Sequence, residues 1–338
     1  MGLQIGDLVA RKEVTFNELK GKTIAVDAFN AIYQFLSSVR QPDGTPLMDS
    51  SGNVTSHLSG LFYRNVALLS EGIKLIYVFD GEYHHLKGKT HELRQAAKDS
   101  MAEKYDEAVE REDVEGMGKY SRGFIKLNSE MIAESKELLE AMGIAVFQAP
   151  GEGEMQCAEI VKNGQAYAVG SQDYDAIAVG GTRLIQNLTL SRKRKTASGF
   201  VYIAPEIIEF ESVINQLGIT GDQLICLAIL VGTDFNPGGV KGIGPKKALA
   251  LVKQKVYPVA IFEDITERFG DVGFDWREIF EIFKKPNVSK QRVSFPKFDE
   301  NKIREVLVEK HEFSSERVAN QIEKLRVVLK SNAQVKLF

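Results

Sequence analysis

The amino-acid sequence predicts an α/β domain in which helices flank a central, mostly parallel β-sheet. Two observations indicate this class. Between residues 23 and 170, short apolar runs of strand length alternate with longer segments of helical periodicity, which is the rhythm of parallel sheets. With 338 residues, 43% of them hydrophobic, the chain can also bury a substantial core.

Four of the apolar runs are predicted strands, because they are short and rich in β-branched and aromatic residues. In chain order they are Thr23–Asp27, Lys74–Phe79, Ile144–Ala149 and Tyr167–Gly170. Helices are predicted at Phe29–Arg40, at Leu58–Leu69, at residues 128–142 and directly after Pro150-Gly151. Gly72 and Gly143 end the second and third of these helices, as glycine commonly does at a helix C-terminus.

Two segments depart from this alternation. Residues 81–127 are strongly charged, with nine basic and nine acidic residues between 86 and 126, and they contain helix formers but little that a core could hold. We predict a helical segment that rises above the sheet, and a plain solvated insertion is the alternative. From about residue 205 onward the pattern becomes mostly helical.

The net charge of −3 is not that of a strongly basic protein, but the charge is unevenly distributed. Residues 192–195 are all basic, and residues 241–255 hold five lysines and no acid. Such patches suit phosphate binding beside an acidic pocket, although solvated lysines on a helix would look the same. Cys157 and Cys226 are predicted to be buried reduced thiols of an intracellular protein.

Several kinds of chemistry find no support in the sequence. There is no Ser-His-Asp grouping, no cysteine pair and no phosphate loop with a lysine. The five histidines lack the spacing of zinc ligands, so no zinc site is expected. The N-terminus has no signal-peptide character and no apolar run approaches the length of a membrane span, so no membrane association is expected.

Carboxylates are the residues that could carry difficult chemistry, because seven of them follow predicted strands or border predicted helices. They are Asp27, Asp80, Glu152, Glu154, Asp173, Asp175 and Asp234. The carboxyl ends of parallel strands form the functional edge of such a sheet. Acids gathered there repel one another unless divalent cations neutralise them, and two such cations are a common device for phosphodiester hydrolysis. Taken singly, each acid could equally be a helix cap or a turn former.

The pair Asp173 and Asp175 carries a further expectation. Residues two apart point the same way on an extended chain and diverge on a helix. We therefore expect both carboxylates, directly after a strand, to reach one ion from extended backbone.

Five segments give the chain a family resemblance. They are VDAFNAIYQFL (26–36), YVFDG (77–81), APGEGEMQCA (149–158), SQDYDAIAVG (171–180) and LVGTDFNPGGVKGIGPKKA (230–248). In this order the chain resembles the XPG/Rad2 family of structure-specific 5′ nucleases, and its archaeal flap endonucleases in particular, from residue 1 to about 330. The resemblance implies a PIN-like 5′ nuclease fold with a helical arch and a DNA-binding element of the helix–hairpin–helix type.

The resemblance also implies roles for single residues. The seven acids would hold two Mg²⁺ ions, for which Mn²⁺ may substitute, and Lys87 and Arg94 in the arch would contact the scissile phosphate. Seven residues apart, Lys87 and Arg94 share one helical face. The implied DNA contacts are Gly2, Tyr33, Arg40, Lys241, Gly242, Gly244, Lys246 and Lys247. A K⁺ ion bound by backbone carbonyls around Gly239, Val240 and Ile243 would help to hold the duplex.

The same resemblance divides the chain into regions. They are an N-terminal nuclease region at 1–98 with the arch beginning near 82, the remainder of the arch at 99–127, an internal nuclease region at 128–258 with its DNA-binding hairpin at 232–255, a C-terminal helical region at 259–330, and a sliding-clamp-binding tail at 331–338. In the tail, Gln334 and Leu337 match the clamp-binding pattern, but the aromatic pair that usually ends it is missing.

The implied function is cleavage of 5′ DNA flaps, with 5′–3′ exonuclease activity, in Okazaki-fragment maturation and repair. Branched DNA would be bound through its backbone, and the sliding clamp PCNA would be a partner of a monomeric enzyme. A cytoplasmic archaeal protein is expected rather than a nuclear one. The alternatives are another 5′ nuclease of the family, acting as an exonuclease or on junctions or bubbles, a non-catalytic DNA- and clamp-binding scaffold, and a single-strand ribonuclease.

Overall fold

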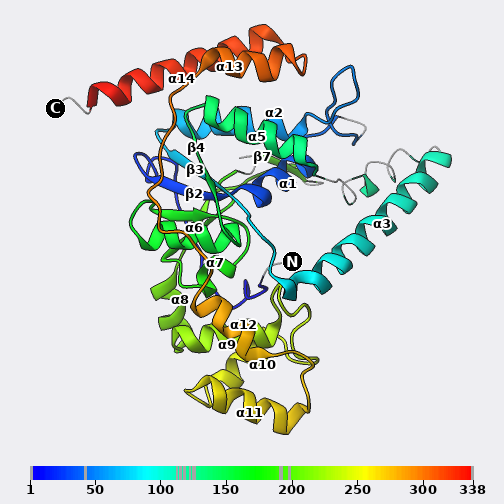
Figure 1. Ribbon diagram of the computed structural model, residues 1–338, viewed down its shortest axis with the longest axis vertical. Coiled ribbons are helices and arrows are strands. Elements are labelled where there is room, and N and C mark those ends of the chain that lie inside the picture. The colour runs from blue at the N-terminus through cyan, green and yellow to red at the C-terminus, as the bar shows by residue number, and fades with distance from the viewer. Residues whose placement is uncertain are drawn as a thin grey trace.

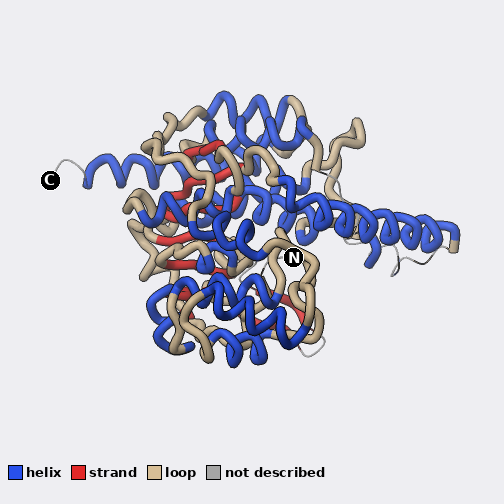
Figure 2. Tube along the Cα trace, turned by 60° about the horizontal axis from the view of Figure 1, so that its bottom comes forward, coloured by secondary structure: helices blue, strands red, loops and turns tan. Residues whose placement is uncertain are grey.

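A central sheet with helices on both sides forms the body of the protein (Figures 1 and 2). The computed structural model describes residues 3–41, 44–111, 113, 116, 119–121, 123, 127–189, 193–196 and 199–335. Within these residues the main sheet has the strand order β1-β9-β6-β5-β2-β3-β4. Its strands are β1 (Lys12–Glu13), β2 (Thr23–Asp27), β3 (Lys74–Phe79), β4 (Ala145–Gln148), β5 (Ala168–Gly170), β6 (Arg183–Gln186) and β9 (Glu206–Glu209).

The sheet is mostly parallel, as the sequence predicts. β2 pairs in parallel with β3 and β5, β3 with β4, and β5 with β6, whereas β9 runs antiparallel to β6 and β1. All four predicted strands are present, and their carboxyl ends lie along one edge because parallel neighbours end on the same side.

The central strands are buried on both faces, and their side chains alternate between two cores. In β3, Leu75, Tyr77 and Phe79 belong to one hydrophobic cluster, while Ile76 and Val78 belong to the other. This arrangement accounts for the continuous apolar runs in the sequence.

Helices of the N- and C-terminal parts cover one face of the sheet (Figure 1). They are α1 (Ala28–Ser38), α2 (Ser56–Ser70), α5 (Ser129–Ala141), α13 (Glu300–Arg304) with the π-helical turn Glu305–Glu309, and α14 (Ser315–Val335). The first helix ends earlier than its predicted limit at Arg40, because Val39 is extended and Arg40 pairs with Pro46 in an isolated bridge.

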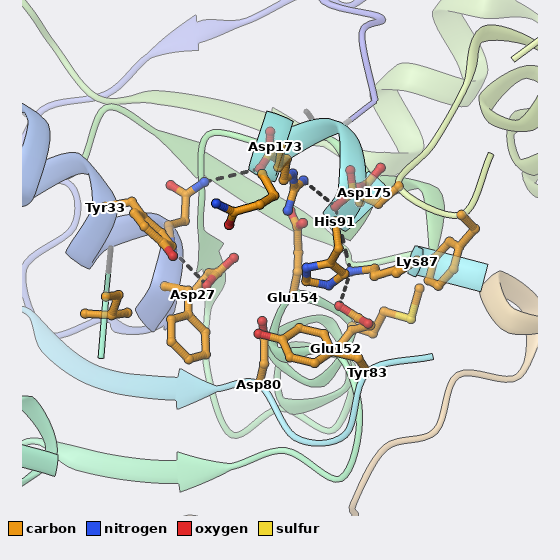
Figure 3. A pocket seen from close by; sticks show the side chains of 18 of the residues that line it. Asp27, Tyr33, Asp80, Tyr83, Lys87, His91, Glu152, Glu154, Asp173 and Asp175 are labelled. Atoms are coloured by element: carbon orange, nitrogen blue, oxygen red, sulfur yellow. Dashed lines mark hydrogen bonds and ion pairs between the residues drawn. The ribbon is translucent and has the colours of Figure 1, made fainter. Parts of the chain in front are cut away.

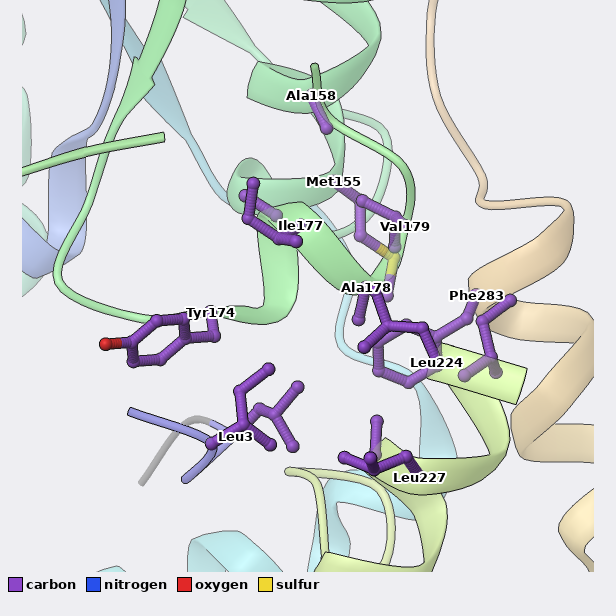
Figure 4. Packing of buried hydrophobic residues seen from close by; sticks show 14 of the residues in the cluster. Leu3, Met155, Ala158, Tyr174, Ile177, Ala178, Val179, Leu224, Leu227 and Phe283 are labelled. Atoms are coloured by element: carbon purple, nitrogen blue, oxygen red, sulfur yellow. The ribbon is translucent and has the colours of Figure 1, made fainter. Parts of the chain in front are cut away.

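The other face carries the second core. Met155, Ile177, Leu224, Leu227 and Phe283 pack together there (Figure 4). The helices on this side are α6 (Gly153–Lys162), α7 (Asp175–Ala178), α8 (Phe210–Leu217), α9 (Gly221–Val231), α10 (Pro245–Val252), α11 (Pro258–Phe269) and α12 (Trp276–Lys284). Cys157 and Cys226 are buried here without a disulfide, which confirms the prediction of buried thiols.

One long helix leaves the body. α3 (Gly88–Glu110) extends away from the rest of the molecule (Figures 1 and 2). Most of its side chains are exposed, which agrees with a charged helical segment that has little to seat in a core.

The prediction of helices after residue 205 was incomplete, because β9 at Glu206–Glu209 is a strand. The short strands β1 and β6 and the hairpin of β7 (Lys193–Thr196) and β8 (Gly199–Tyr202) were also not predicted. These segments have two to four residues, too few for a period to be recognised, and pairing with distant neighbours decides their conformation.

Among the described residues, no single helix has both the length and the apolar composition of a membrane span. One pair, α8 and α9, meets that criterion together, but the two helices are bent by 81° at their junction.

A buried histidine ties the loop before α2 to the C-terminal helices. Nδ1 of His311 lies 2.9 Å from a carboxylate oxygen of Asp49, and Nε2 lies 2.9 Å from one of Glu134. Burial would lower the pKa of His311, but the two hydrogen-bonded carboxylates outweigh it and raise the pKa above its ordinary value of 6.5. The ring, hydrogen-bonded at both nitrogens, is therefore an imidazolium that donates to both carboxylates.

Replacing His311 with glutamine is expected to lower the melting temperature at pH 6 by about 2–4 °C. A histidine whose pKa is raised by folding stabilises the protein below pH 6.5, and this stabilisation is lost as the pH rises through the folded-state pKa. The difference between wild type and variant should therefore shrink towards pH 9, as thermal unfolding from pH 6 to 9 would measure. The exposed His91→Gln variant serves as control, and a pH-independent difference would contradict the charged state.

Candidate active site

All seven predicted acids line one cavity of about 590 Å³ at the carboxyl edge of the parallel strands. Figure 3 shows most of these carboxylates directed towards one another. Tyr33, Lys87 and Arg94 line the same cavity. The structure thus brings together residues that lie as far as 207 positions apart in the chain, from Asp27 to Asp234.

The strand ends and the helix starts orient the first acids. Asp27 ends β2 and caps α1, with its Oδ1 accepting a hydrogen bond from the Asn30 backbone N–H at 3.1 Å. Asp80 follows β3, and its Oδ1 accepts from the Gly153 N–H at 2.6 Å. A Cβ atom at Gly153 would lie 2.6 Å from that same oxygen. Glycine between Glu152 and Glu154 is therefore required for the close approach of Asp80 to the start of α6.

The expectation of an extended Asp173-Tyr174-Asp175 segment is wrong. Tyr174 has a helical backbone conformation, and Asp175 begins the short helix α7. Both carboxylates nevertheless reach the cavity, because other contacts hold them there. Nδ2 of Asn30 donates to Oδ2 of Asp173 at 3.2 Å, and the Leu3 N–H donates to Oδ1 of Asp175 at 3.2 Å. A tight turn and long-range hydrogen bonds, and not the alternation of side chains along a strand, bring both carboxylates into the cavity.

Asp234 enters the site from the end of α9. Asn236 builds the turn: its Oδ1 accepts from the Thr233 N–H at 3.1 Å, and its Nδ2 donates to the Ile229 carbonyl at 2.7 Å. The turn directs Asp234 towards α3, where Oγ1 of Thr90 donates to the Asp234 carbonyl at 2.6 Å.

The 3-10 turn His85–Lys87 and the α3 helix that follows it bring the two predicted basic residues against these acids. The Lys87 ammonium pairs with Glu152 and lies 3.7 Å from Oδ2 of Asp234. The Arg94 guanidinium lies 2.7 Å from that same Asp234 oxygen. Lys87 is almost buried, whereas Arg94 is about half exposed. Both cations therefore lie at the boundary between the acid cluster and the opening of the cavity.

Burial and mutual repulsion raise the pKa values of four of the clustered carboxylates. Burial and the neighbouring charge of Asp80 raise the pKa of Asp27 to about 8. Burial and Asp173 raise the pKa of Asp175 to about 7. For Asp80, burial and Glu152 raise the pKa to about 6, and burial with Asp175 raises that of Glu154 well above its ordinary range.

The donor set suits a hard divalent cation. Oε1 of Glu154 is buried and has no hydrogen-bond partner among the described residues, although a buried carboxylate oxygen normally has one. Carboxylate oxygens are the ligands that Mg²⁺, Mn²⁺ and Ca²⁺ prefer. A cation at this position would satisfy the oxygen and lower the repulsion at the same time.

The remaining predicted DNA contacts lie outside the cavity, apart from Tyr33. Arg40 donates to the Gly44 carbonyl at 2.7 Å and to Oγ of Ser121 at 2.9 Å. Gly2 lies outside the described residues, as do residues 336–338 of the predicted tail. The residues of the predicted hairpin gather between α9 and α10 and in the first turn of α10, where they are exposed: Lys241, Gly242, Gly244, Lys246 and Lys247.

Sequence reasoning missed several side chains of the cavity, among them Asn30, Tyr83, Lys98 and Phe235. Two of them carried a detectable signal. Asn30 lies three residues after Asp27, in the first turn of the helix that Asp27 caps, and Lys98 lies four residues after Arg94 on the same helical face. Tyr83 and Phe235 carried none, because they stand in loops.

Comparison with known proteins gives the chain its family. Residues 3–101 match the XPG N-terminal domain and residues 143–234 match the XPG I-region. A flap endonuclease 1 of Pyrococcus horikoshii is 49% identical, with 99% of this chain and 96% of that protein covered.

Solved structures agree with this relationship. Flap endonuclease-1 from Methanococcus jannaschii is 38% identical, with a TM-score of 0.77 over 98% of this chain and all of that one. The catalytic core of Rad2 in complex with DNA substrate has the same fold, with 22% identity and a TM-score of 0.70 over 96% of this chain and all of that one. The identity to the Pyrococcus horikoshii protein over nearly the full length of both chains shows that this chain belongs to the flap endonuclease 1 family.

Proposed function

We propose that this chain is a structure-specific nuclease that hydrolyses DNA at 5′ flaps, using divalent cations held by its seven clustered carboxylates. Family membership supports the flap endonuclease activity. The observation that carries the metal dependence is the charge balance of the cavity. Among the described residues that line it, seven carboxylates face three lysine and arginine side chains, Lys87, Arg94 and Lys98. The acids outnumber these lysine and arginine side chains by four, and divalent cations would neutralise the excess negative charge.

Two Mg²⁺ ions, or Mn²⁺ in their place, would bind among these acids, polarise the phosphodiester and activate water for its attack. Asp27, Asp80, Glu152, Glu154, Asp173, Asp175 and Asp234 are the ligands we propose. Because folding raises the pKa of Asp27 to about 8 and that of Asp175 to about 7, cation binding would release protons, since a carboxylate must be deprotonated to act as a ligand.

Lys87 and Arg94 would bind the scissile phosphate. They pair with Glu152 and Asp234, so these two acids would be shared between the basic side chains and bound metal ions. Metal binding would free the two basic groups to stabilise the negative charge that develops on the phosphate oxygens. Tyr33, 40% exposed at the cavity, would stack on a base near the cut.

The hairpin between α9 and α10 would hold the duplex by its backbone. Gly244 gives specific support for this role. Its φ of −88° is open to any residue, and a Cβ there would meet no other atom within 4 Å. Neither backbone conformation nor packing requires glycine at this position. The missing side chain leaves the N-terminus of α10 open to the close approach of a phosphate.

Gly244→Ala should fold with equal or slightly higher stability, because alanine reduces the entropy of the unfolded chain. It should weaken duplex binding about tenfold, the cost of one hydrogen bond to a charged phosphate. Lys246→Ala is the comparison, since removing one phosphate contact lowers the salt dependence of binding by about one unit of slope. Thermal unfolding and binding titrations at several salt concentrations measure both. Unchanged affinity in Gly244→Ala would contradict the phosphate contact.

One cleavage assay tests the proposed function. A duplex with a 5′ flap, a plain duplex, junction and bubble DNA, and matched single strands of DNA and RNA are each incubated with the protein, with Mg²⁺ or with a chelator, and the products are mapped. We expect cleavage at the flap junction with Mg²⁺ and none with chelator. Shortening of a plain duplex end in place of flap removal would indicate a 5′ exonuclease, and cutting of junctions or bubbles a different family activity. Binding without any cleavage would indicate a scaffold, and cutting of single-stranded RNA a ribonuclease.

We further propose a bound K⁺ ion, a protein partner, an oligomeric state and a cellular location. A K⁺ ion at the carbonyls around Gly239, Val240 and Ile243 is supported by the tightness of that turn, where a Cβ on Gly239 would lie 2.3 Å from the Leu230 carbonyl oxygen. We also propose PCNA binding through the 331–338 tail, a monomeric state, a cytoplasmic location and the division of the chain into the regions predicted above. Co-elution with the clamp, before and after removal of the tail, tests the first of these.

A further inference from the structure

We propose that His84, His85 and Glu278 form a binding site for a late divalent transition metal such as Zn²⁺, at the base of α3 and outside the acidic cavity. One potential ligand atom from each of the three residues lies within 4.8 Å of the others. The two histidines precede α3, and Glu278 belongs to α12. This inference does not depend on the nuclease activity.

The donor set is the first reason. Two histidines and one glutamate, with water as fourth ligand, are a set that binds zinc in proteins. Ligands of a tetrahedral zinc ion lie about 3.3 Å apart, given bond lengths of about 2.0 Å. Nε2 of His85 and Oε1 of Glu278 are already 3.1 Å apart, so that edge needs almost no movement. Imidazole ligands favour zinc, copper or nickel, whereas the acidic cavity offers only the oxygen ligands of Mg²⁺.

The His84 ring is held in place by packing. The rings of His84 and His85 lie 4.4 Å apart and are tilted by 32°, and His84 packs edge-on against Phe235 at 5.9 Å. Phe235 in turn packs against Phe283 of α12 at 5.7 Å. This support reduces the entropy that metal binding would otherwise cost. Nδ1 of His84 receives only a long contact of 3.4 Å from the Leu86 N–H, which an ion can displace.

The site also has access and space. The His85 side chain is 70% exposed and that of Glu278 is 38% exposed, so their contact contributes little to stability by itself. A cavity of about 500 Å³ borders His84 and Glu278 and leaves room for a water ligand. Spacing along the sequence could not indicate this site, because the carboxylate stands 193 residues after His85.

A bound ion would link the segment that leads into α3 directly to α12. Lys87 lies two residues beyond His85 and reaches the acidic cavity. The ion would therefore restrain the segment that holds Lys87 and leads into α3, the helix that holds Arg94. Zinc would have a structural role at this site, and the divalent cations proposed for catalysis would bind in the acidic cavity.

Zinc titration of the full chain tests the proposal. A chromogenic chelator competes for Zn²⁺ in the presence of saturating Mg²⁺, which occupies the oxygen ligands of the acidic cavity. We expect the wild type to take up one zinc ion, and the affinity to fall at least tenfold in His85→Ala and in Glu278→Gln. Glu281→Gln is the matched control, because Glu281 lies one turn further along α12 and pairs with Lys285 at 2.8 Å. Its zinc affinity should equal that of the wild type.

Thermal unfolding without zinc establishes that each variant is folded, and unfolding with zinc gives a second readout. Zinc should raise the melting temperature of the wild type and of Glu281→Gln, and not that of Glu278→Gln. The proposal is wrong if the wild type takes up no zinc under Mg²⁺ saturation. It is equally wrong if His84→Ala/His85→Ala and Glu278→Gln bind zinc as tightly as the wild type.

Discussion

Replacing Asp175 with alanine is expected to abolish Mg²⁺-dependent flap cleavage, with a loss of at least about a thousandfold in rate. A cation in a hydrolytic site supplies several kcal/mol of charge stabilisation, and about 4 kcal/mol corresponds to that factor. Asp175 is buried, and the negative charges of Asp173 and Asp234 raise its pKa. Its own charge in turn raises the pKa of Glu154. Duplex binding should change little, because the hairpin between α9 and α10 lies outside the cavity. Single-turnover cleavage and duplex titration measure the two effects.

A conservative variant separates metal binding from folding. The pKa of Asp175 is raised by folding to about 7, so its charge destabilises the metal-free protein as the pH rises from about 4 to 7. Asp175→Asn should therefore melt higher than the wild type at pH 8 with chelator, and gain less from Mg²⁺. The surface variant Asp222→Asn, which loses only an exposed pair with Lys284, is the control for both readouts. Full cleavage by Asp175→Ala would refute the metal assignment.

Lys87→Ala is expected to slow cleavage by about 10²–10³-fold, the usual cost of removing one group that stabilises transition-state charge. Burial alone would lower the pKa of Lys87, but the charge and hydrogen bond of Glu152 outweigh it and raise the pKa. The side chain is therefore a firmly protonated cation at the edge of the acid cluster. Its loss removes positive charge from the place where the phosphate would bind.

Metal affinity distinguishes this role from a structural one. Lys87 competes with cations for Glu152 and Asp234, so Lys87→Ala should bind Mn²⁺ at least as tightly as the wild type while it cuts slowly. Lys89→Ala is the matched control, because Lys89 is exposed at the start of α3, two residues beyond Lys87, and its loss changes the charge equally. If both variants cut equally fast, or if Lys87→Ala loses its metal, the phosphate-binding role is wrong.

The central fold was predictable because its strands are buried on both faces. The run Lys74–Phe79 is apolar at every position after the first, and β3 has those same limits. The short strand β9 was not predictable, since Glu-Ile-Ile-Glu offers two apolar residues and no recognisable period. Its conformation comes from pairing with β6 and β1, which are separated from it by 19 or more residues.

The acids themselves could be identified from the sequence, because carboxylates at the ends of parallel strands must meet at one edge. How they meet could not. Asp175 stands on a helical turn instead of a strand, held by the Leu3 backbone, and Asp234 arrives through a turn built by Asn236. The proposed zinc site likewise joins His84 and His85 to Glu278 of α12, nearly 200 residues away in the chain.

Residue type and local periodicity alone determined the central parallel strands, the helices that flank them and which acids cluster, because burial and strand direction act on neighbouring residues. Which loops converge, and which cation faces which carboxylate, was decided only by tertiary structure. The physical reason is that these contacts are short-range in space and long-range along the chain, so no local pattern encodes them.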